Sequence, residues 1–434
     1  DGRYTGIRMC NELLENIDRV PDLDPELKKR YIGEAKVLRA YNYYELYTKF
    51  GDVPYTTKVL SIKESMSIAR TAKATVIANV LADLDEVING NYLPTSYDAD
   101  NKGRITRWAA MAIKAKIYLF EGNWTQVKNI TSTIMTEGGF KLFGSYAGLF
   151  EIANEYNSEV ILDAQYRPTS REHQMMYVFL PPTLGGYSQL SPLQELVDSY
   201  IMLDGKTIKE TGTSFDESHP YANRDPRLKA TVMYTGNSYT LADGTEVVIN
   251  CEKGEGKDGY GVGSDCSATG YYIKKYWDNT YRATLYSGLN PILIRYADIL
   301  LMNAEALAEL GELDKTAWDA TIKPIRDRAG FTLASALEFP EGASKDKLIE
   351  IVRNERRSEL ALEGHRHKDI IRWRIADNVL NGWCHGLKTN DVVGTDDGYV
   401  RVENRTFNAN KHYLWPIPQA ERDLNGNLEQ NPNW

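Results

Sequence analysis

Glu355, Glu359 and Glu363 are the residues of this chain whose type and spacing could support acid–base chemistry. They recur every four residues and continue a helical stripe that Leu348 and Val352 begin, so acids occupy the line expected to face the core. Glu355 and Glu359 could act as the paired acids of a glycosidase, but such acids usually converge from different elements. A buried carboxylate must be paired or neutralised, so we interpret the stretch as a buried ion-pair network. The available cations are Arg353, Arg356, Arg357, Arg366, Arg372 and Arg374.

The histidines and cysteines form no complete metal-binding pattern. His365 and His367 flank an arginine, but neither an HExxH motif nor a second Glu-x-x-His helix completes a ligand set. The four cysteines contain no CxxC pair. Cys251 and Cys266 could close a glycine-rich loop as a disulfide, or they could remain two separate thiols. We expect no cofactor, and the acidic loops leave a bound calcium ion open.

Other catalytic motifs do not occur in a suitable context. The chain has no nucleophile elbow, phosphate-binding loop or dinucleotide fingerprint, and its six histidines form no recognisable Ser-His-Asp arrangement. The formal net charge of -9 argues against nucleic acid as the main partner. No apolar run is long enough to span a membrane. These observations predict a binding protein and not an enzyme.

Helical periodicity dominates both ends of the chain and predicts a mainly α fold. We expect one unit over residues 1–434, with helix pairs in 6–137, an irregular loop and short-strand region in 138–290, and helix pairs and a tail in 291–434. The expected strands include 159–166 and 270–277. The expected helices cover residues 6–17, 26–50, 74–89, 105–121, 125–137, 291–310, 317–330 and the stretch that starts at 346.

The helix pairs are punctuated by small residues, aromatic residues and glycine turns, which is typical of tetratricopeptide-like units that build a superhelical body. In the helix over 26–50, Arg39 lies in the middle and Asp52 follows the end. We expect these two residues to be structural partners.

Several blocks of the sequence resemble the SusD/RagB family. The strongest is Asn354–Leu360 followed by Glu363–Arg366 and Asp369–Trp373, which is similar to the family's C-terminal signature. Further matches cover nearly the whole chain, with Asp298 where glutamate is commoner and Asn433-Trp434 where Gly-Tyr is more usual. These further matches are Leu38–Tyr41, Gly51–Pro54, Asn223–Leu228, Arg295–Ala306 and Trp415–Pro418. The resemblance implies a fold built on tetratricopeptide units, in which the Glu355–Glu363 stretch supports the fold and does not touch ligand.

The resemblance also implies a function at the bacterial surface. Members of this family are nutrient-binding lipoproteins of Bacteroidota that capture oligosaccharide or polysaccharide and deliver it to a SusC-like TonB-dependent transporter. We therefore expect an outer-membrane lipid anchor on a cysteine before Asp1, and an outer-surface location. The alternative function is capture of peptides, as in the RagB branch of the family. The third hypothesis is a glycoside hydrolase that uses Glu355 or Glu359.

Aromatic side chains in loops are the candidate ligand contacts, because a sugar face stacks on a ring while amides and acids hold its hydroxyls. Tyrosine is abundant, with 28 residues against 10 Phe and 8 Trp. The family's founding starch binder places its aromatic residues in loops from two regions of the chain. The resemblance therefore implies the location of the site in this chain, but it does not identify the individual residues. The alternative is that these side chains pack at the edge of the fold, Trp277 against the helix after Pro291. The candidates are Tyr92, Tyr97 and Asn101 in one loop and Trp277, Asn279 and Tyr281 in the other.

Overall fold

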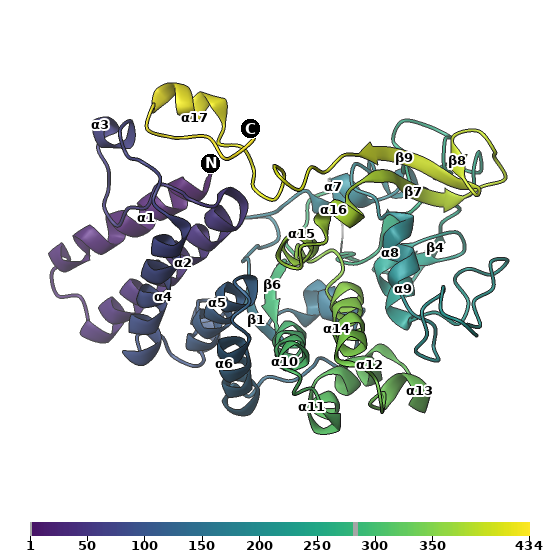
Figure 1. Cartoon of the computed structure of the whole chain (residues 1–434), viewed down its shortest axis with the longest axis horizontal. Helices are drawn as coiled ribbons and strands as arrows, with labels where there is room; N and C mark the ends of the chain where they lie inside the picture. Colours follow the sequence, from purple (N-terminus) through teal and green to yellow (C-terminus); the bar gives the residue numbers. More distant parts are fainter. Residues whose placement is uncertain (1, 281–284) are drawn as a thin grey trace. The chain divides into compact units, whose positions relative to one another are not determined.

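The computed structural model describes residues 2–280 and 285–434, which form two compact units. Unit 1 contains the described residues up to Gly139 together with His367–Leu380 and Phe407–Trp434. Unit 2 contains Phe140–Arg366 and Asn381–Thr406. The expected segment 291–434 therefore contributes to both units. Figure 1 follows the chain through its elements.

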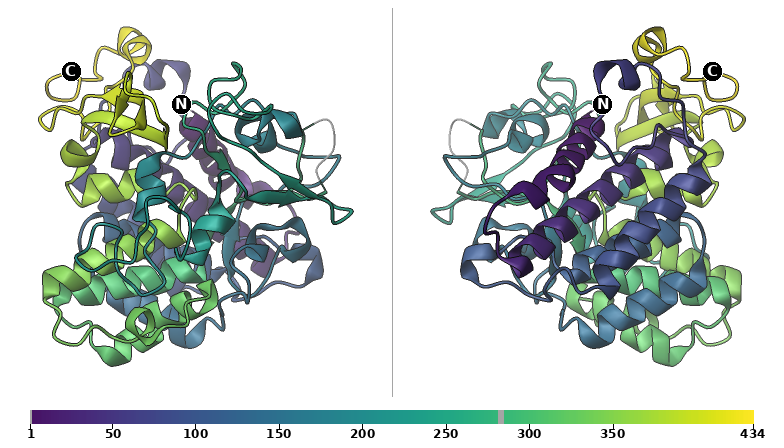
Figure 2. Two further views of the ribbon diagram at one scale, coloured as in Figure 1. Left: turned by 90° about the vertical axis from the view of Figure 1, so that its right-hand side faces the viewer. Right: turned by 90° about the vertical axis from the view of Figure 1, so that its left-hand side faces the viewer.

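Unit 1 is a set of helices in which each long helix packs on the next (Figure 2, purple to blue). Asp24 begins the longest of them by accepting a hydrogen bond from the Leu27 N–H at 2.8 Å, and Gly51 ends it with a φ of 70° that favours glycine. The bounds lie within a few residues of those expected, except at the N-terminus, where the first helix begins earlier. The helices are α1 (Gly2–Asn16), α2 (Pro25–Phe50), α3 (Ile62–Ser65), α4 (Lys73–Asn89), α5 (Arg107–Phe120) and α6 (Trp124–Glu137).

The expected pairing of Arg39 with Asp52 is wrong. Arg39 points from the middle of α2 toward α4, where its Nη2 lies 2.6 Å from Asp83 Oδ2, and its Nη1 donates to Asn11 Oδ1 at 2.9 Å. Asp52 lies beyond the end of α2 and instead accepts a hydrogen bond from the Lys73 N–H at 2.8 Å. The α2 helix directs Arg39 toward α4, whereas Asp52 lies in the segment after the helix and caps the start of α4, which sequence spacing alone did not reveal.

The C-terminal part of unit 1 adds short helices and a tail. Ile370, Ile371 and Ala376 are buried together against Phe120 and Phe407. The elements are α15 (Arg366–Arg372), which begins at the last residue of unit 2, α16 (Ala376–Val379) and α17 (Gln419–Leu424).

Unit 2 combines helices with short antiparallel strand pairs around an aromatic core that includes Phe150, Tyr200, Tyr239 and Tyr272. Its helices are α7 (Met175–Phe179), α8 (Gln194–Ser199), α9 (Pro226–Thr231), α10 (Tyr296–Leu310), α11 (Lys315–Ala320), α12 (Ile322–Ala329), α13 (Ala334–Leu337) and α14 (Lys345–Glu359). Its strands pair as β1 (Val160–Asp163) with β6 (Ile292–Arg295), β2 (Val232–Met233) with β5 (Tyr272–Ile273), β3 (Ser238–Thr240) with β4 (Glu246–Val248), and β7 (Gly382–Lys388) and β8 (Thr395–Asp396) with β9 (Tyr399–Arg405). The prediction of a mainly α fold with a short-stranded middle is confirmed.

The helix expected from Pro291 begins later than predicted. Ile292–Arg295 forms β6, which pairs with β1 in a register that sets Arg295 opposite Val160, and α10 starts only at Tyr296. An apolar run of this length is compatible with a buried strand or a helix, and pairing with β1 decides between them.

The Glu355–Glu363 stretch is likewise not one continuous helix. Helix α14 ends at Glu359, and a turn with Leu362 at φ 64° and Gly364 at φ 80° separates it from α15. Glu363 therefore lies in the turn and not on the helix.

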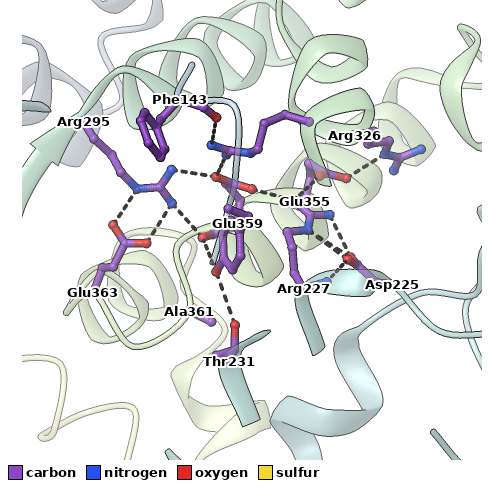
Figure 3. A network of polar contacts seen from close by, with 12 residues as sticks. Phe143, Asp225, Arg227, Thr231, Arg295, Arg326, Glu355, Glu359, Ala361 and Glu363 are labelled. Atoms are coloured by element: carbon purple, nitrogen blue, oxygen red, sulfur yellow. Dashed lines mark hydrogen bonds and ion pairs between the residues drawn. The ribbon is translucent and has the colours of Figure 1, made fainter. Parts of the chain in front are cut away.

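The predicted buried ion-pair network is present, and Glu359 lies at its centre (Figure 3). The cations expected from the sequence are wrong, because the acids pair with basic residues of other elements, whereas Arg356 pairs with Asp298 and Arg353 with Glu309. The Glu359 carboxylate is fully buried and lies 2.6 Å from Arg295 Nη1 and 2.8 Å from Arg227 Nη1, with Arg328 as a third partner. Burial alone would raise the pKa of Glu359, but Arg328, Arg295 and Arg227 hold it well below its ordinary value. The carboxylate is therefore ionised and shared by three guanidinium groups.

The network extends from Glu359 through the rest of unit 2. Glu355 contacts Arg227 and Arg326, both at 2.7 Å, and the turn residue Glu363 lies 2.8 Å from Arg295. The same guanidinium groups reach acids on other elements, so the charges balance. The acids are Glu159, Asp225, Glu355, Glu359 and Glu363, and the bases are Arg227, Lys275, Arg295, Arg326 and Arg328.

We predict that Glu359→Ala lowers the free energy of unfolding by about 3–5 kcal/mol, because it leaves buried guanidinium charge without its partner. Urea denaturation measures the change. Glu350→Ala, at a more exposed position on the same helix, is the matched control and should change stability by less than about 1 kcal/mol. Equal effects of the two substitutions would contradict a central role for Glu359.

Candidate functional site

Unit 2 contains a cavity of 1160 Å³ whose walls come from distant parts of the sequence. Its lining side chains come from a loop at 215–222, the turn at 234–236, the segment 250–255 and the loop at 388–391 after β7. Gln194 of α8, Tyr271 and Tyr399 complete the walls. The cavity therefore depends on the folding of unit 2 and not on any local motif.

Aromatic rings form much of the cavity surface. Tyr221 and Tyr234 are stacked with ring centroids 4.0 Å apart, and the Tyr221 hydroxyl lies 3.3 Å from that of Tyr271. Phe215 and Tyr399 add two further half-buried rings to the lining. Rings held in this way offer faces on which an apolar ligand surface can stack.

Arg224 holds the aromatic loop in place. It is buried, and its guanidinium donates to the carbonyl of Pro220 at 2.7 Å, to that of Val197 at 2.6 Å and to that of Tyr200 at 2.8 Å. The guanidinium carbon also lies 5.4 Å from the centre of the Phe215 ring. The loop at 215–222 is thereby fastened to α8, which gives its rings a defined position.

Two ion pairs join the end of β7 and the loop after it to other segments that line the cavity. Lys388 Nζ lies 2.8 Å from Glu217, and Lys253 pairs with Asp391. Both pairs are largely exposed and contribute little to stability. A ligand can therefore compete for these groups without unfolding the site.

Other polar groups on the wall are free to bind a ligand. Within residues 2–280 and 285–434, the carboxylates of Glu252 and Glu255 and the side-chain amide of Asn390 have no protein partner, and all three are exposed. Carboxylates accept hydrogen bonds and an amide both donates and accepts, so together they match a hydroxyl-rich ligand. Rings for stacking and free acceptors for hydroxyl groups are the combination that a sugar requires.

The first predicted loop lies in unit 1, and its polar groups are already bound within the protein. The Tyr92 hydroxyl donates to Glu86 at 3.0 Å, and the Tyr97 hydroxyl donates to the Ile105 carbonyl at 3.1 Å. Burial, followed by nearby Glu34, raises the pKa of Tyr97 to about 12. Asn101 donates to Asp98 at 2.8 Å within a single turn. The rings of Tyr92 and Tyr97 remain partly exposed, so a ligand could contact their carbon atoms but would find their hydroxyl groups already bonded.

The second predicted loop lies in unit 2. The Trp277 indole N–H donates to the Thr240 carbonyl at 2.8 Å, and its ring centroid lies 5.1 Å from that of Tyr239. Asn279 is partly exposed, and Tyr281 lies outside the described residues. The two predicted loops belong to different units, and none of the predicted residues that the structure describes lines the cavity in unit 2.

Glu355 and Glu359 have no geometry for catalysis. Their side chains are at most 1% exposed and face arginines, so substrate has no access to either carboxylate. Cys251 and Cys266 are both free thiols, which settles the disulfide question left open by the sequence. In the part of the chain that the structure describes, no cluster of three or more His, Cys, Asp or Glu side chains is placed to hold a metal ion.

The cavity residues themselves were missed at the sequence level. Phe215, Tyr221, Tyr234 and Tyr399 are separated by up to 184 positions (399 minus 215), and no spacing rule relates them. The only available signal was the abundance of tyrosine, which indicates partly wet surfaces without locating them.

Two family models match the chain. The model of the SusD family matches residues 149–434, more than half of the sequence, and a model described as starch-binding and associating with outer membrane matches residues 1–119. No helix among the described residues is both long enough and apolar enough to cross a membrane. The resemblance seen in the sequence motifs is confirmed.

Individual relatives agree with the family match. SusD-like protein P25 of Formosa agariphila is 28% identical over 401 residues, which is 87% of this chain and 70% of the relative. A SusD-like carbohydrate binding protein of Bacteroides fragilis has a TM-score of 0.87 and 29% identity, covering 98% of this chain and 84% of that one. A laminarin binding SusD-like protein has a TM-score of 0.68 at 24% identity, covering 100% of this chain and 84% of that one, and shares the fold.

His385 anchors the strands next to the cavity and yields a pH prediction. Its Nδ1 lies 2.8 Å from Glu195 of α8 and its Nε2 lies 3.0 Å from Asp396 of β8, which also pairs with Arg401. A neutral imidazole can donate only one of these hydrogen bonds, so the arrangement favours the imidazolium. Burial by itself would lower the pKa of His385, but the hydrogen bonds to Asp396 and Glu195 outweigh it and raise the pKa.

We predict that the stability contributed by His385 is complete below its unfolded pKa of about 6.5 and is lost as pH rises through the higher folded value. An NMR titration of the ring should give a pKa above about 6.5. His385→Gln should remove this part of the pH dependence of unfolding, whereas His219→Gln, at an exposed histidine with a single carboxylate partner, should leave it unchanged. A ring pKa at or below the ordinary value would show that the anchor is not an imidazolium.

Proposed function

The chain belongs to the SusD family, and on that premise we propose that it binds oligosaccharide or polysaccharide at the cell surface and delivers it to a SusC-like TonB-dependent transporter. The observation that carries the binding part is the cavity of unit 2, in which stacked rings lie beside unpaired acceptors. Sugars present apolar ring faces together with hydroxyl-rich edges, and both kinds of surface have a counterpart on these walls.

The size of the cavity favours a ligand of several sugar units. Its 1160 Å³ exceeds the range of about 300–1,000 Å³ for small-molecule pockets, so it has room for more than one sugar ring. The rings come from separate loops, which allows successive sugars of one chain to stack on different residues. The carbohydrate binding named for the Bacteroides fragilis protein and the laminarin binding named for the other structural neighbour are consistent with this class of ligand.

Delivery and location form the second part of the proposal. The family model that covers the N-terminal part is described as associating with outer membrane, which supports a surface location. A lipid on a cysteine preceding Asp1, as expected from the resemblance, would hold the protein at the outer leaflet. The transporter would then receive ligand from a protein attached to the same membrane.

We predict that replacing Phe215, Tyr234 or Tyr399 by alanine weakens binding of the cognate glycan by about 1–3 kcal/mol per ring, because each substitution removes a stacking surface. Isothermal titration calorimetry against a panel that includes starch oligosaccharides, laminarin and peptides measures the change. Tyr156→Ala removes an exposed ring of unit 2 that does not line the cavity and is the matched control. Binding of peptides without any glycan would overturn the choice of ligand.

The same titration tests the loops predicted from the sequence, with Tyr97→Ala and Trp277→Ala as the variants. A loss of affinity in these two, with none in the three cavity variants, would move the site to the loops and reject the cavity. Unchanged affinity with a lowered melting temperature would assign Tyr97 and Trp277 to packing.

We predict that the protein purified from outer membranes in mild detergent carries a TonB-dependent transporter with it, and that its mature N-terminus bears an acylated cysteine. Co-purification followed by mass spectrometry of both chains tests the two statements. Recovery of mature protein without lipid from whole cells would reject the anchor, and recovery without any barrel protein would reject the delivery step.

A further inference from the structure

Unit 1 contains a second cavity, of 450 Å³, whose character differs from that of the cavity in unit 2. It is bounded by α1, the end of α2, the segment that follows α2 and the C-terminal tail. Helices α3 and α17 lie beside it, and Asn425 joins them by donating to the carbonyls of Ser65 at 3.3 Å and Ile68 at 2.8 Å. Figure 1 shows these two short helices next to each other.

The walls of this cavity are apolar. The polar side chains among them are used by the protein itself, since Tyr4 donates to the Pro54 carbonyl at 3.0 Å and Asn11 donates to the carbonyls of Thr56 at 3.3 Å and Lys58 at 3.1 Å. The surface that faces the cavity is therefore mainly hydrocarbon. Its apolar residues are Ile7, Leu46, Phe50, Val53, Leu60, Ile62, Ile68, Ile417 and Leu428.

The mouth of the cavity carries positive charge. Arg8 and Lys58 line it and are exposed; in the part of the chain that the structure describes, neither forms a salt bridge, although Lys58 interacts electrostatically with the exposed carboxylate of Glu64. Arg70 also lines it, but its guanidinium donates to the carbonyls of Phe50, Asp52 and Glu429. The acid on the wall is Glu421, so cations outnumber it.

Apolar surface continues from the cavity to the outside. Ile62 lines the cavity and is 80% exposed, because α3 holds it out on a single helical turn. This turn is kept in place by a capping box in which Ser61 and Glu64 bond each other's backbone N–H groups. A water-exposed aliphatic side chain at the entrance of an apolar cavity favours a ligand with a hydrocarbon part.

We propose that this cavity binds an amphiphile that has one acyl chain and an anionic head, such as a long-chain fatty acid. The chain lies along the apolar walls, and the head lies at the mouth between Arg8 and Lys58. The volume of the cavity falls within the range of about 300–1,000 Å³ for ligand pockets. A sugar is disfavoured, because Tyr4 and Asn11 on these walls are bonded within the protein and most of the remaining lining is hydrocarbon. The site is separate from the proposed glycan site, which lies in unit 2.

Fluorescence titration with cis-parinaric acid, an 18-carbon fatty acid probe, tests the proposal on the full chain. The expected result is saturable binding of one probe per chain. Arg8→Glu combined with Lys58→Glu should weaken binding about tenfold or more, because the reversed charges repel the carboxylate. Lys209→Glu combined with Lys345→Glu, two exposed charges in unit 2, is the matched control and should leave binding unchanged.

Two cavity-filling substitutions, Leu60→Trp and Ile68→Trp, separately test whether the acyl chain occupies the cavity. Each should abolish binding of the fatty acid probe, while binding of the glycan, measured by calorimetry, is retained. Using two positions keeps the test valid if one variant fails to fold. Binding to phosphatidylglycerol vesicles is measured as well, to distinguish a membrane lipid from a free fatty acid as the source of the acyl chain. The proposal is overturned if the wild type shows no saturable probe binding, if the filled variants bind as the wild type does, or if only vesicles bind and filling has no effect.

Discussion

The buried carboxylate of Glu359 is the interaction on which unit 2 depends. It lies at the end of α14 and brings together Arg295 from β6, Arg328 from α12 and Arg227 from α9, elements that are far apart in the sequence. An ionised carboxylate in the interior is unfavourable unless it is fully partnered, so each of these elements has only one acceptable position around it. The network thus determines the arrangement of unit 2 more than it adds to its stability.

The candidate glycan site follows from this arrangement. Asp225 begins α9 and holds Arg227 at 2.8 Å, and Arg224 one residue earlier fastens the preceding loop to α8. Tyr221 lies before α9 and Tyr234 follows the strand after it, so their stacked rings are positioned by the same helix that enters the ion-pair network. The surface that we propose for ligand binding is exposed, but its geometry is set by buried charge.

The two cavities differ in how their polar groups are used. In unit 2, Glu252, Glu255 and Asn390 line the cavity and have no partner among the residues that the structure describes, which suits a ligand with many hydroxyl groups. In unit 1, Tyr4 and Asn11 give their hydrogen bonds to backbone carbonyls, which leaves hydrocarbon walls and a cationic mouth. The chemistry that each cavity can recognise is therefore decided less by which residue types line it than by whether their polar atoms are already bonded.

The sequence by itself determined the mainly helical fold, the family and the buried ionic character of Glu355 and Glu359, because these depend on local periodicity and contiguous motifs. Only the tertiary structure decided that Ile292–Arg295 is a strand, since its partner Val160–Asp163 lies about 130 residues earlier. It also decided that Arg39 pairs with Asp83 and that Glu363 joins the network from a turn. The cavities were beyond the reach of the sequence for the same reason. Their walls are assembled from residues such as Tyr221 and Tyr399, and no spacing rule predicts which distant side chains a folded core will bring together.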